Sequence, residues 1–244
     1  MLRADALATR YLFHPLRKLR PRTNRIPILM YHSVSDAVQE DTHPYYRTVT
    51  TPAVFERQMR YLKEHGYSSA SPREAAQWME SGGQFPELQV VITFDDGFRD
   101  FYTNAFPSLQ KYDFSATVYL PTAYIGSTTR TFKGIECLTW SEVRELRDAG
   151  IEFDSHTVNH PQLRTVGTES VKHELKASKE SIEQVLCADV KSFSYPYAFP
   201  ETDRVFIERL QGMLKEEGYE NGVSTMIGTE DRDRKSTRLN SSHI

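Results

Sequence analysis

Hydrophobic runs of strand length alternate with amphipathic helical segments along most of the chain. Short β-branched and aromatic runs predict buried strands at residues 26–31, 88–94, 115–120, 151–155, 191–195 and 222–227. Apolar side chains at helical spacing predict helices between them at residues 51–66, 71–80, 101–112, 139–149, 168–187 and 203–217. Strands that alternate with helices favour parallel pairing through right-handed crossovers. We therefore expect an α/β fold, either a barrel or a doubly wound sheet.

Capping residues support several of these helices. Thr51 followed by Pro52 predicts one helix start, and Ser71 with Glu74 three residues later forms a capping-box sequence at another. The longest predicted helix, 168–187, places four apolar residues on one face: Val171, Leu175, Ile182 and Leu186. This face is expected to pack inward.

Polar residues follow the predicted strands where the strands end. They are His32, Asp95, Asp96, His156, His160 and Tyr197. In α/β barrels the carboxyl ends of the strands carry the chemistry. The shared placement predicts one functional site built from several strands.

Asp95 and Asp96 end the hydrophobic run LQVVITF and are followed by Gly97. Neighbouring side chains at a strand end point in different directions, so one carboxylate can bind a cation while the other transfers protons. Gly97 permits a turn that a Cβ would hinder. An Asp-Asp-Gly turn that only joins two elements is the common alternative, and this motif alone favours it.

His156 and His160 are four residues apart, a spacing that lets both imidazoles face one point on a helix or in a tight loop. Two histidines and a carboxylate that leave positions open for water and substrate are typical of a catalytic metal site. Two histidines that only form hydrogen bonds are the alternative, and the Asp-Asp pair on the same rim favours the metal site. If Asp96 binds the metal, Asp95 is left as a general base toward water.

Hydrolysis of an acyl group would require two further groups. A rigid backbone N–H can hold the oxyanion, and Tyr197 is a candidate because Pro196 fixes the preceding backbone. His32 is a candidate acid for the expelled amine because the ordinary pKa of histidine lies in the useful range. At this point an ordinary strand-end histidine explains His32 equally well.

Composition narrows the class of partner. The chain has 244 residues, 39% of them hydrophobic, which is enough for one globular domain. A net charge of -3 and a pI near 6.3 give no electrostatic case for a nucleic-acid partner. Cys137 and Cys187 form neither a CxxC pair nor a disulfide framework, so we interpret them as small buried apolar residues.

Residues 1–25 mix arginine and lysine with apolar side chains. This basic segment could lie on an anionic membrane surface as an amphipathic helix, or it could pack against the domain. No run has the length of a transmembrane helix, and the N-terminus lacks the apolar core of a secretion signal. We expect a cytoplasmic protein, or one bound peripherally at the cytoplasmic face of the membrane.

Three motifs resemble those of the polysaccharide deacetylases, the NodB-homology enzymes of carbohydrate esterase family 4. They are residues 93–97 (TFDDG), 155–161 (SHTVNHP) and 195–197 (YPY). The resemblance spans about residues 26–228. It implies a distorted (β/α) barrel that removes N-acetyl groups from amino sugars with one divalent metal, often zinc, with cobalt, nickel and manganese as alternatives.

The resemblance also implies roles for individual residues. It makes Asp95 the base and Tyr197 the backbone donor to the oxyanion, with Tyr195 and Pro196 as substrate contacts. The implied metal ligands are Asp96, His156 and His160. These roles agree with the interpretation based on the strand ends.

Two departures from the family pattern matter. Ser194 stands where the third motif usually has an arginine, and the later motifs, an Asp-Trp segment and a terminal Leu-x-His with the catalytic acid, are absent. The opening LMYHSV, residues 29–34, resembles the branch that makes partly deacetylated poly-N-acetylglucosamine, in which the last motif is moved to the N-terminus. This resemblance implies that His32 is the acid.

Residues 229–244 show no apolar period, and from about Lys235 they resemble translated sequencing-adapter read-through. We expect a non-native or disordered tail after a catalytic domain at 26–228, and a barrel that lacks its native C-terminal strand.

The predicted function is metal-dependent removal of N-acetyl groups from an N-acetylated amino sugar in a polysaccharide or lipid-linked glycan. One alternative is an esterase for O-acetyl groups of a xylan-type polysaccharide. Another uses the same ligands for iron(II) and oxygen, and the free Asp95 beside them argues against it. The last is an inactive carbohydrate-binding homologue.

Overall fold

The computed structural model describes residues 26–37, 48–81, 86 and 88–225, and the backbone of 238–240 and 242–243. The predicted basic segment 1–25 lies outside the described residues.

A nine-stranded sheet forms the centre of the molecule, and all of its strand pairs are parallel. The order is β12-β11-β10-β9-β6-β5-β1-β13, and β4 pairs with the first part of β5. The strands are β1 (Ile28–Tyr31), β4 (Ser68–Ala70), β5 (Gln89–Phe94), β6 (Thr117–Leu120), β9 (Glu152–Ser155), β10 (Ser192–Ser194), β11 (Asn221–Ser224), β12 (Arg238–Asn240) and β13 (Ser242–His243). The curled parallel sheet confirms the predicted (β/α) barrel fold.

The short strands β12 and β13 are the two ends of this strand order, because β12 pairs with β11 and β13 pairs with β1. They fall within the tail that was predicted from residue 229 onward. The non-native origin of that tail stays a prediction, although the backbone of these two segments continues the sheet.

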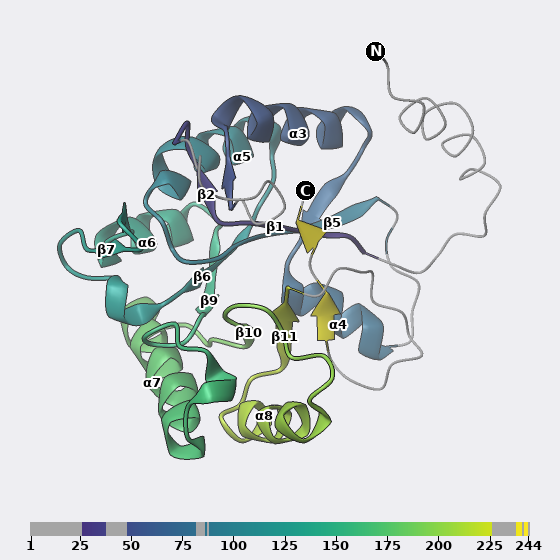
Figure 1. Ribbon diagram of the computed structural model, residues 1–244. Coiled ribbons are helices and arrows are strands. Elements are labelled where there is room, and N and C mark those ends of the chain that lie inside the picture. Colours follow the sequence, from purple (N-terminus) through teal and green to yellow (C-terminus); the bar gives the residue numbers. More distant parts are fainter. Residues whose placement is uncertain are drawn as a thin grey trace, which may run out of the picture.

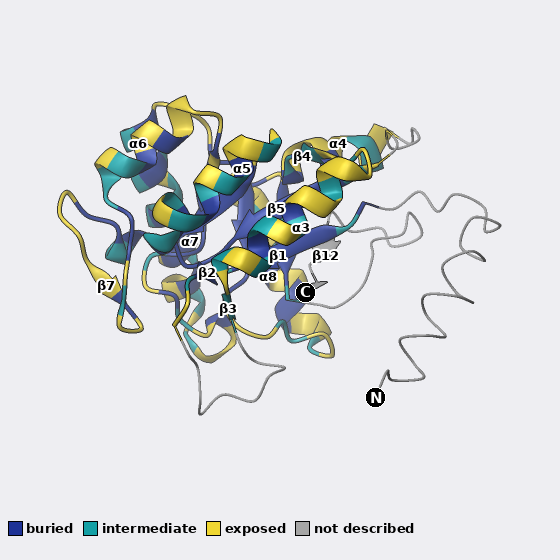
Figure 2. Cartoon of the chain, turned by 90° about the horizontal axis from the view of Figure 1, so that it is seen from above, coloured by how far each residue is buried: buried dark blue, intermediate teal, exposed yellow. Residues whose placement is uncertain are grey.

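Helices cover the outside of the sheet (Figure 1). They are α3 (Pro52–Glu64), α4 (Pro72–Ser81), a π-helix at Phe101–Ala105, α5 (Phe106–Tyr112), α6 (Trp140–Asp148), α7 (Thr168–Leu186) and α8 (Arg204–Glu216). Each predicted helix is confirmed, although the segment 101–112 begins with the π-helical turn. Figure 2 shows buried strands at the centre and exposed residues on the outer faces of the helices.

The predicted helix starts form as expected. The Thr51 side chain accepts a hydrogen bond from the N–H of Val54 at the start of α3. Ser71 and Glu74 form the reciprocal bonds of a capping box at the start of α4. The apolar face of α7 is buried, including Val171 and Leu175.

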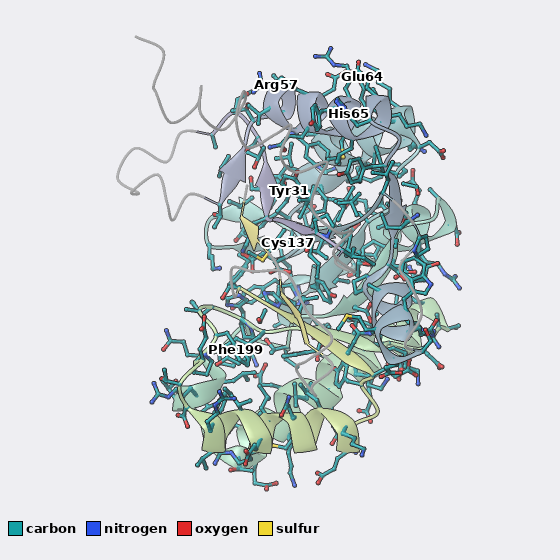
Figure 3. All side chains as sticks on the ribbon, turned by 90° about the vertical axis from the view of Figure 1, so that its right-hand side faces the viewer. Tyr31, Arg57, Glu64, His65, Cys137 and Phe199 are labelled. Atoms are coloured by element: carbon teal, nitrogen blue, oxygen red, sulfur yellow. The ribbon has the colours of Figure 1, made fainter. Side chains whose placement is uncertain are left out.

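Aromatic residues near the strand ends anchor the strands in the core between sheet and helices. The ring of Tyr31 stacks on that of Phe94 at 5.2 Å between centroids, and both rings contact Phe55 of α3. Because side chains alternate along a strand, His32 and Asp95, which come next, point away from these helices. Figure 3 shows Tyr31 within the molecule, whereas Arg57 and Glu64 lie on the outer side of α3.

The two cysteines differ from each other. Cys137 is buried, as expected, but Cys187 is exposed. Cys187 follows the last residue of α7 with a left-handed backbone (φ 50°), so its side chain leaves the buried face of the helix. The prediction of burial was wrong for Cys187.

Candidate functional site

The carboxyl ends of neighbouring strands meet at one edge of the barrel. Tyr31 of β1 is in register with Phe94 of β5, and Leu120 of β6 with Ser155 of β9. Phe193 of β10 is also in register with Ser155. The residues that follow these strands therefore share that edge. His32, Asp95, Asp96 and His156 come within two residues of a strand end, and Tyr197 follows β10 after Tyr195 and Pro196.

One oxygen of Asp96 lies against both histidines of the predicted ligand set. Asp96 Oδ1 is 3.2 Å from His160 Nε2 and 3.6 Å from His156 Nε2. One ligand atom from each of the three residues lies within 4.8 Å of the others, and all three side chains are buried. Asp96 Oδ1 has no hydrogen-bond donor among the described residues, as expected of an oxygen that awaits a cation.

His156 is held in the form that a metal requires. Its Nδ1 donates a hydrogen bond to the carbonyl oxygen of Ser194 at 2.8 Å, which leaves Nε2 with its lone pair directed to Asp96. Burial lowers the pKa of His156 to about 3, and the neighbouring His160 lowers it further. A neutral imidazole is the metal-binding state, so the side chain is suited to act as a ligand.

The loop between the two histidines is held by Glu174 of α7. The buried Glu174 carboxylate accepts hydrogen bonds from the N–H groups of Val158 and Asn159, each at 2.8 Å, and from Asn159 Nδ2 at 2.7 Å. Thr157 and His160 both have left-handed backbones, with φ of 70° and 55°. Such conformations are costly for side chains with a Cβ, so Glu174 stabilises a strained loop.

Asp95 is buried beside Asp96, but Asp95 contacts Ser194 whereas Asp96 contacts the two histidines. Burial raises the pKa of the Asp95 carboxyl to about 8, and the negative charge of Asp96 acts in the same direction. A hydrogen bond with Ser194 and the charge of Lys133 oppose this shift. A carboxyl with a pKa near neutrality suits proton transfer. The two adjacent carboxylates therefore have different surroundings.

Residues 82–214 match the family model of the polysaccharide deacetylases. The chain belongs to the polysaccharide deacetylase family. It is similar to the Bacillus subtilis protein YxkH, which bears a polysaccharide deacetylase name, with 31% identity over 211 residues that cover 86% of this chain and 68% of the relative. It is also similar to a Staphylococcus aureus poly-β-1,6-N-acetyl-D-glucosamine N-deacetylase, with 25% identity over 82% of this chain and 73% of the relative.

A solved structure agrees with this family assignment. The Streptococcus pyogenes deacetylase PplD, in complex with acetate, has 28% identity to the chain and a TM-score of 0.77, covering 90% of this chain and 92% of that one. The comparisons confirm the predicted family, the NodB-type barrel and the enzyme class, a hydrolase of non-peptide carbon–nitrogen bonds. In the part of the deacetylase that the structure describes, no helix has both the length and the apolar character needed to cross a bilayer.

The second oxygen of Asp96 contacts a lysine that the sequence analysis did not identify. Lys133 Nζ is 3.1 Å from Asp96 Oδ2 and lies 4.5 Å from the centre of the Phe132 ring. Lys133 and Gly134 both have positive φ and form the turn between β7 (Thr131–Phe132) and β8 (Ile135–Glu136). The hairpin delivers Lys133 to a carboxylate 37 residues away in the chain, so no local spacing predicts the contact.

The surroundings of Asp96 keep this carboxyl ionised. Burial opposes ionisation, but the close approach of His160, the interactions with the His32 and His156 imidazoles and the charge of Lys133 outweigh it and hold the pKa of Asp96 below its ordinary value. His32, which is half-buried, is one of the groups that lower the pKa of Asp96. An ionised Asp96 is the form that binds a cation.

The YPY motif presents its last residue at the surface and buries the other two. Tyr197 is 45% exposed, has a φ of 62°, and its ring lies 4.6 Å from that of His160. Pro196 is buried, and the Tyr195 ring packs on Phe199 at 5.0 Å in the core. Contact of the Tyr195 ring with substrate, as predicted, conflicts with its burial. Tyr195 and Pro196 instead anchor the backbone that carries Tyr197.

Proposed function

We propose that this protein is a metal-dependent N-deacetylase of a polymer of N-acetylglucosamine, with β-1,6-linked chains as the first substrate to test. The observation that carries the proposal is the buried cluster of Asp96, His156 and His160 with Asp95 beside it. The name of the Staphylococcus aureus relative supports the choice of glycan.

The donor set suits a divalent cation, and zinc is the ion we propose. Two imidazole nitrogens and one carboxylate oxygen form the ligand set of many catalytic zinc sites. The Asp96 Oδ1 without a donor and the fixed Nε2 of His156 support this assignment. When bound, a divalent cation would supply Lewis-acid chemistry at the acetyl carbonyl and would make the attacking water more acidic.

Asp95 accepts the proton of the attacking water in this proposal. The carboxyl lies next to Asp96 in the chain, yet it is hydrogen-bonded to Ser194 rather than to either histidine. It can therefore take up a proton while the ligand set stays intact. The new bond joins the water oxygen to the acetyl carbon.

His32 and Tyr197 complete the reaction. His32 donates a proton to the amide nitrogen as its bond to the acetyl carbon breaks, so that acetate and a free amino sugar leave. The N–H of Tyr197 stabilises the negative charge on the carbonyl oxygen, because Pro196 and the left-handed backbone fix this peptide. Each of these roles uses a residue at the end of a different strand.

Metal analysis and acetate release on the full chain test the proposal. The purified protein is stripped with a chelator, reloaded with zinc, and incubated with a β-1,6-linked N-acetylglucosamine oligomer, a chitin oligomer or acetylated xylan. We expect one zinc per chain, and acetate release from the amino-sugar oligomers without oxygen. Preferential release from xylan would support the O-acetyl esterase instead, and a requirement for oxygen would support the iron alternative.

Two substitutions separate metal binding from proton transfer. Asp95→Asn should keep the metal and lose turnover, because it removes the base and leaves the ligands. His156→Ala should lose both. Turnover retained in Asp95→Asn would overturn the base assignment, and oligomer binding without acetate release by the zinc-loaded wild type would indicate an inactive carbohydrate-binding homologue.

A further inference from the structure

Two side chains that follow the Asp-Asp-Gly turn contact the backbone immediately after His32. Asp100 Oδ2 accepts a hydrogen bond from the Ser33 hydroxyl, and the Asp100 carboxylate also accepts one from the N–H of Val34. Asn104 Nδ2 donates to the carbonyl oxygen of Val34 at 2.7 Å. Ser33 and Val34 are buried. The two residues after His32 are thus held by two polar side chains from another part of the chain.

A π-helix directly follows Asp100 and contains Asn104. Asp100 directly precedes the π-helix Phe101–Ala105, and its carboxylate makes no capping bond to that helix. Phe101 and Ala105 are buried in the core, which fixes the helix against the sheet. π-Helical turns are rare and are frequent at functional sites. The Asp100 carboxylate therefore forms its hydrogen bond with the segment after His32 and does not cap the helix that it precedes.

Burial of the Asp100 carboxylate costs desolvation free energy, and no hydrogen bond to the π-helix that follows it offsets this cost. Burial raises the pKa of Asp100, and the hydrogen bonds with Ser33 and Val34 only partly oppose this. A fold that needed only a packed loop could use an apolar side chain at this position. The cost is consistent with a requirement for fixed geometry.

The same segment also carries the proposed base and a proposed metal ligand. Asp95 and Asp96 lie a few residues before Asp100, and the N–H of Asp95 donates to the carbonyl oxygen of Tyr31 at 2.9 Å. The backbone next to His32 is therefore tied to the Asp95 segment on both sides, at Tyr31 and at Ser33. These ties fix the separation between the proposed acid and the proposed base.

We propose that Asp100 and Asn104 are positioning residues that hold His32 for proton donation to the leaving group. This proposal rests on the role of His32 as the acid in the proposed function. Positioning matters because a small displacement of a reacting group can cost a large factor in rate. The effect should appear only with substrates whose leaving group needs a proton.

Leaving-group dependence provides the test. Zinc-loaded wild type, His32→Ala and Asp100→Ala are assayed with the β-1,6-linked N-acetylglucosamine oligomer and with 4-nitrophenyl acetate, whose aryl oxide departs without protonation. Asp100→Ala should lower kcat for the oligomer by about tenfold or more, with KM and zinc content unchanged, and should change 4-nitrophenyl acetate hydrolysis by less than about twofold. Asp148→Ala, a change at an exposed carboxylate on α6, is the matched control.

The outcomes separate this inference from the proposed function. If His32→Ala lowers both activities equally, the acid assignment fails. If His32→Ala is selective for the oligomer but Asp100→Ala is not, only the positioning role fails. Loss of zinc or an equal loss of both activities in Asp100→Ala would show a purely structural role and overturn the inference.

Two further variants keep the test decisive if Asp100→Ala folds poorly. Asp100→Asn retains an oxygen that accepts from Ser33, so it should recover most of the oligomer activity. The double variant His32→Ala/Asp100→Ala should be no slower on the oligomer than His32→Ala, because two residues that act through one step are not additive. An additive loss, or no recovery in a folded Asp100→Asn, would contradict the positioning role.

Discussion

Two segments at the rim of the barrel carry the histidines of the site: one contains His156 and His160, and the other contains His32. A carboxylate from elsewhere in the chain holds each segment. Glu174 of α7 binds the loop between His156 and His160 through two backbone N–H groups and one side-chain amide. Asp100 binds the segment after His32 through a serine hydroxyl and one N–H group. The loop held by Glu174 contains two left-handed residues.

The two carboxylates hold segments with different proposed roles. His156 and His160 are proposed metal ligands, and such ligands need a fixed geometry. The buried Glu174 carboxylate, both of whose oxygens accept hydrogen bonds, holds the strained loop between them. In the proposed mechanism His32 is a general acid, which needs correct placement toward the leaving group, and Asp100 and Asn104 hold the two residues that follow it. We therefore expect changes around Glu174 to affect metal binding and changes around Asp100 to affect only turnover.

Removal of Glu174 should have the largest effect. Glu174→Ala removes the carboxylate that accepts hydrogen bonds from the N–H groups of Val158 and Asn159. Because hydrogen bonds to a charged group contribute more than neutral ones, the change should lower the free energy of unfolding by about 3 kcal/mol or more. It should also weaken zinc binding by roughly 10- to 100-fold. Urea denaturation and chelator competition measure the two quantities.

Glu174→Gln is the matched control for this change. The amide oxygen of glutamine can still accept from both backbone N–H groups, and Asn159 can rotate its amide to bond with the new NH₂ group. Zinc binding in Glu174→Gln should stay close to wild type. Equal zinc affinity in wild type and Glu174→Ala would show that Glu174 does not support the geometry of the two histidines.

Ser194 lies between the two regions, and its removal should have an intermediate effect. Ser194→Ala deletes the hydroxyl that bonds Asp95 but keeps the carbonyl oxygen that accepts from His156. Zinc content should be unchanged while kcat falls by about tenfold, equivalent to about 1.4 kcal/mol. Ser194→Thr retains a hydroxyl and should recover activity. A loss of zinc in Ser194→Ala would mean that the side chain also supports the ligand.

Asn104→Ala should have a smaller effect on turnover. It removes one neutral hydrogen bond, from Asn104 Nδ2 to the carbonyl oxygen of Val34, while Asp100 still holds Ser33. We expect about a fivefold loss of oligomer turnover, equivalent to about 1 kcal/mol. Measurement of kcat for the oligomer and for 4-nitrophenyl acetate checks this. A loss as large as that of Asp100→Ala would contradict the expectation that Asp100 contributes more to turnover than Asn104.

The smallest effect on turnover is expected at Asp154 of β9, which ties β9 to β10 below the His156 loop. Asp154 Oδ1 accepts from the N–H groups of Lys191 and Ser192, and burial raises the pKa of this carboxyl to about 7. Because the folded pKa exceeds the unfolded value of 3.8, Asp154 contributes stability below about pH 4 that is lost as the pH rises through 7.

Asp154→Asn keeps the accepting oxygen and removes the titration. In the chelator-treated protein, the free energy of unfolding of wild type should therefore fall more steeply between about pH 4 and 7 than that of Asp154→Asn, at about 1.4 kcal/mol per unit of pKa difference. Urea denaturation across this range measures the slopes, with Asp189→Asn at the surface as a control. Parallel slopes in wild type and Asp154→Asn would contradict the raised pKa.

The fold was predictable from the sequence because strand and helix patterns alternate along the chain and each motif follows a strand. The same logic gathered Asp96, His156 and His160, whose positions follow from parallel strand order. Lys133 was not predictable, because its contact with Asp96 depends on how a hairpin folds back over the rim.

The sequence contained one overlooked signal. Glu174 falls within the apolar face of its helix, beside Leu175, and an acidic residue at such a position indicates a buried partner. Asp100 had no comparable signal, because it contacts Ser33, which lies 67 residues away in the chain, and no local spacing predicts that contact.

The backbone and the side chain of Ser194 contact different members of the site. Its carbonyl oxygen, which orients His156, belongs to the backbone of β10 and is present whatever the residue type. Its side chain alone meets Asp95. A substitution at residue 194 can therefore change the surroundings of the proposed base, Asp95, and retain the carbonyl oxygen that orients His156.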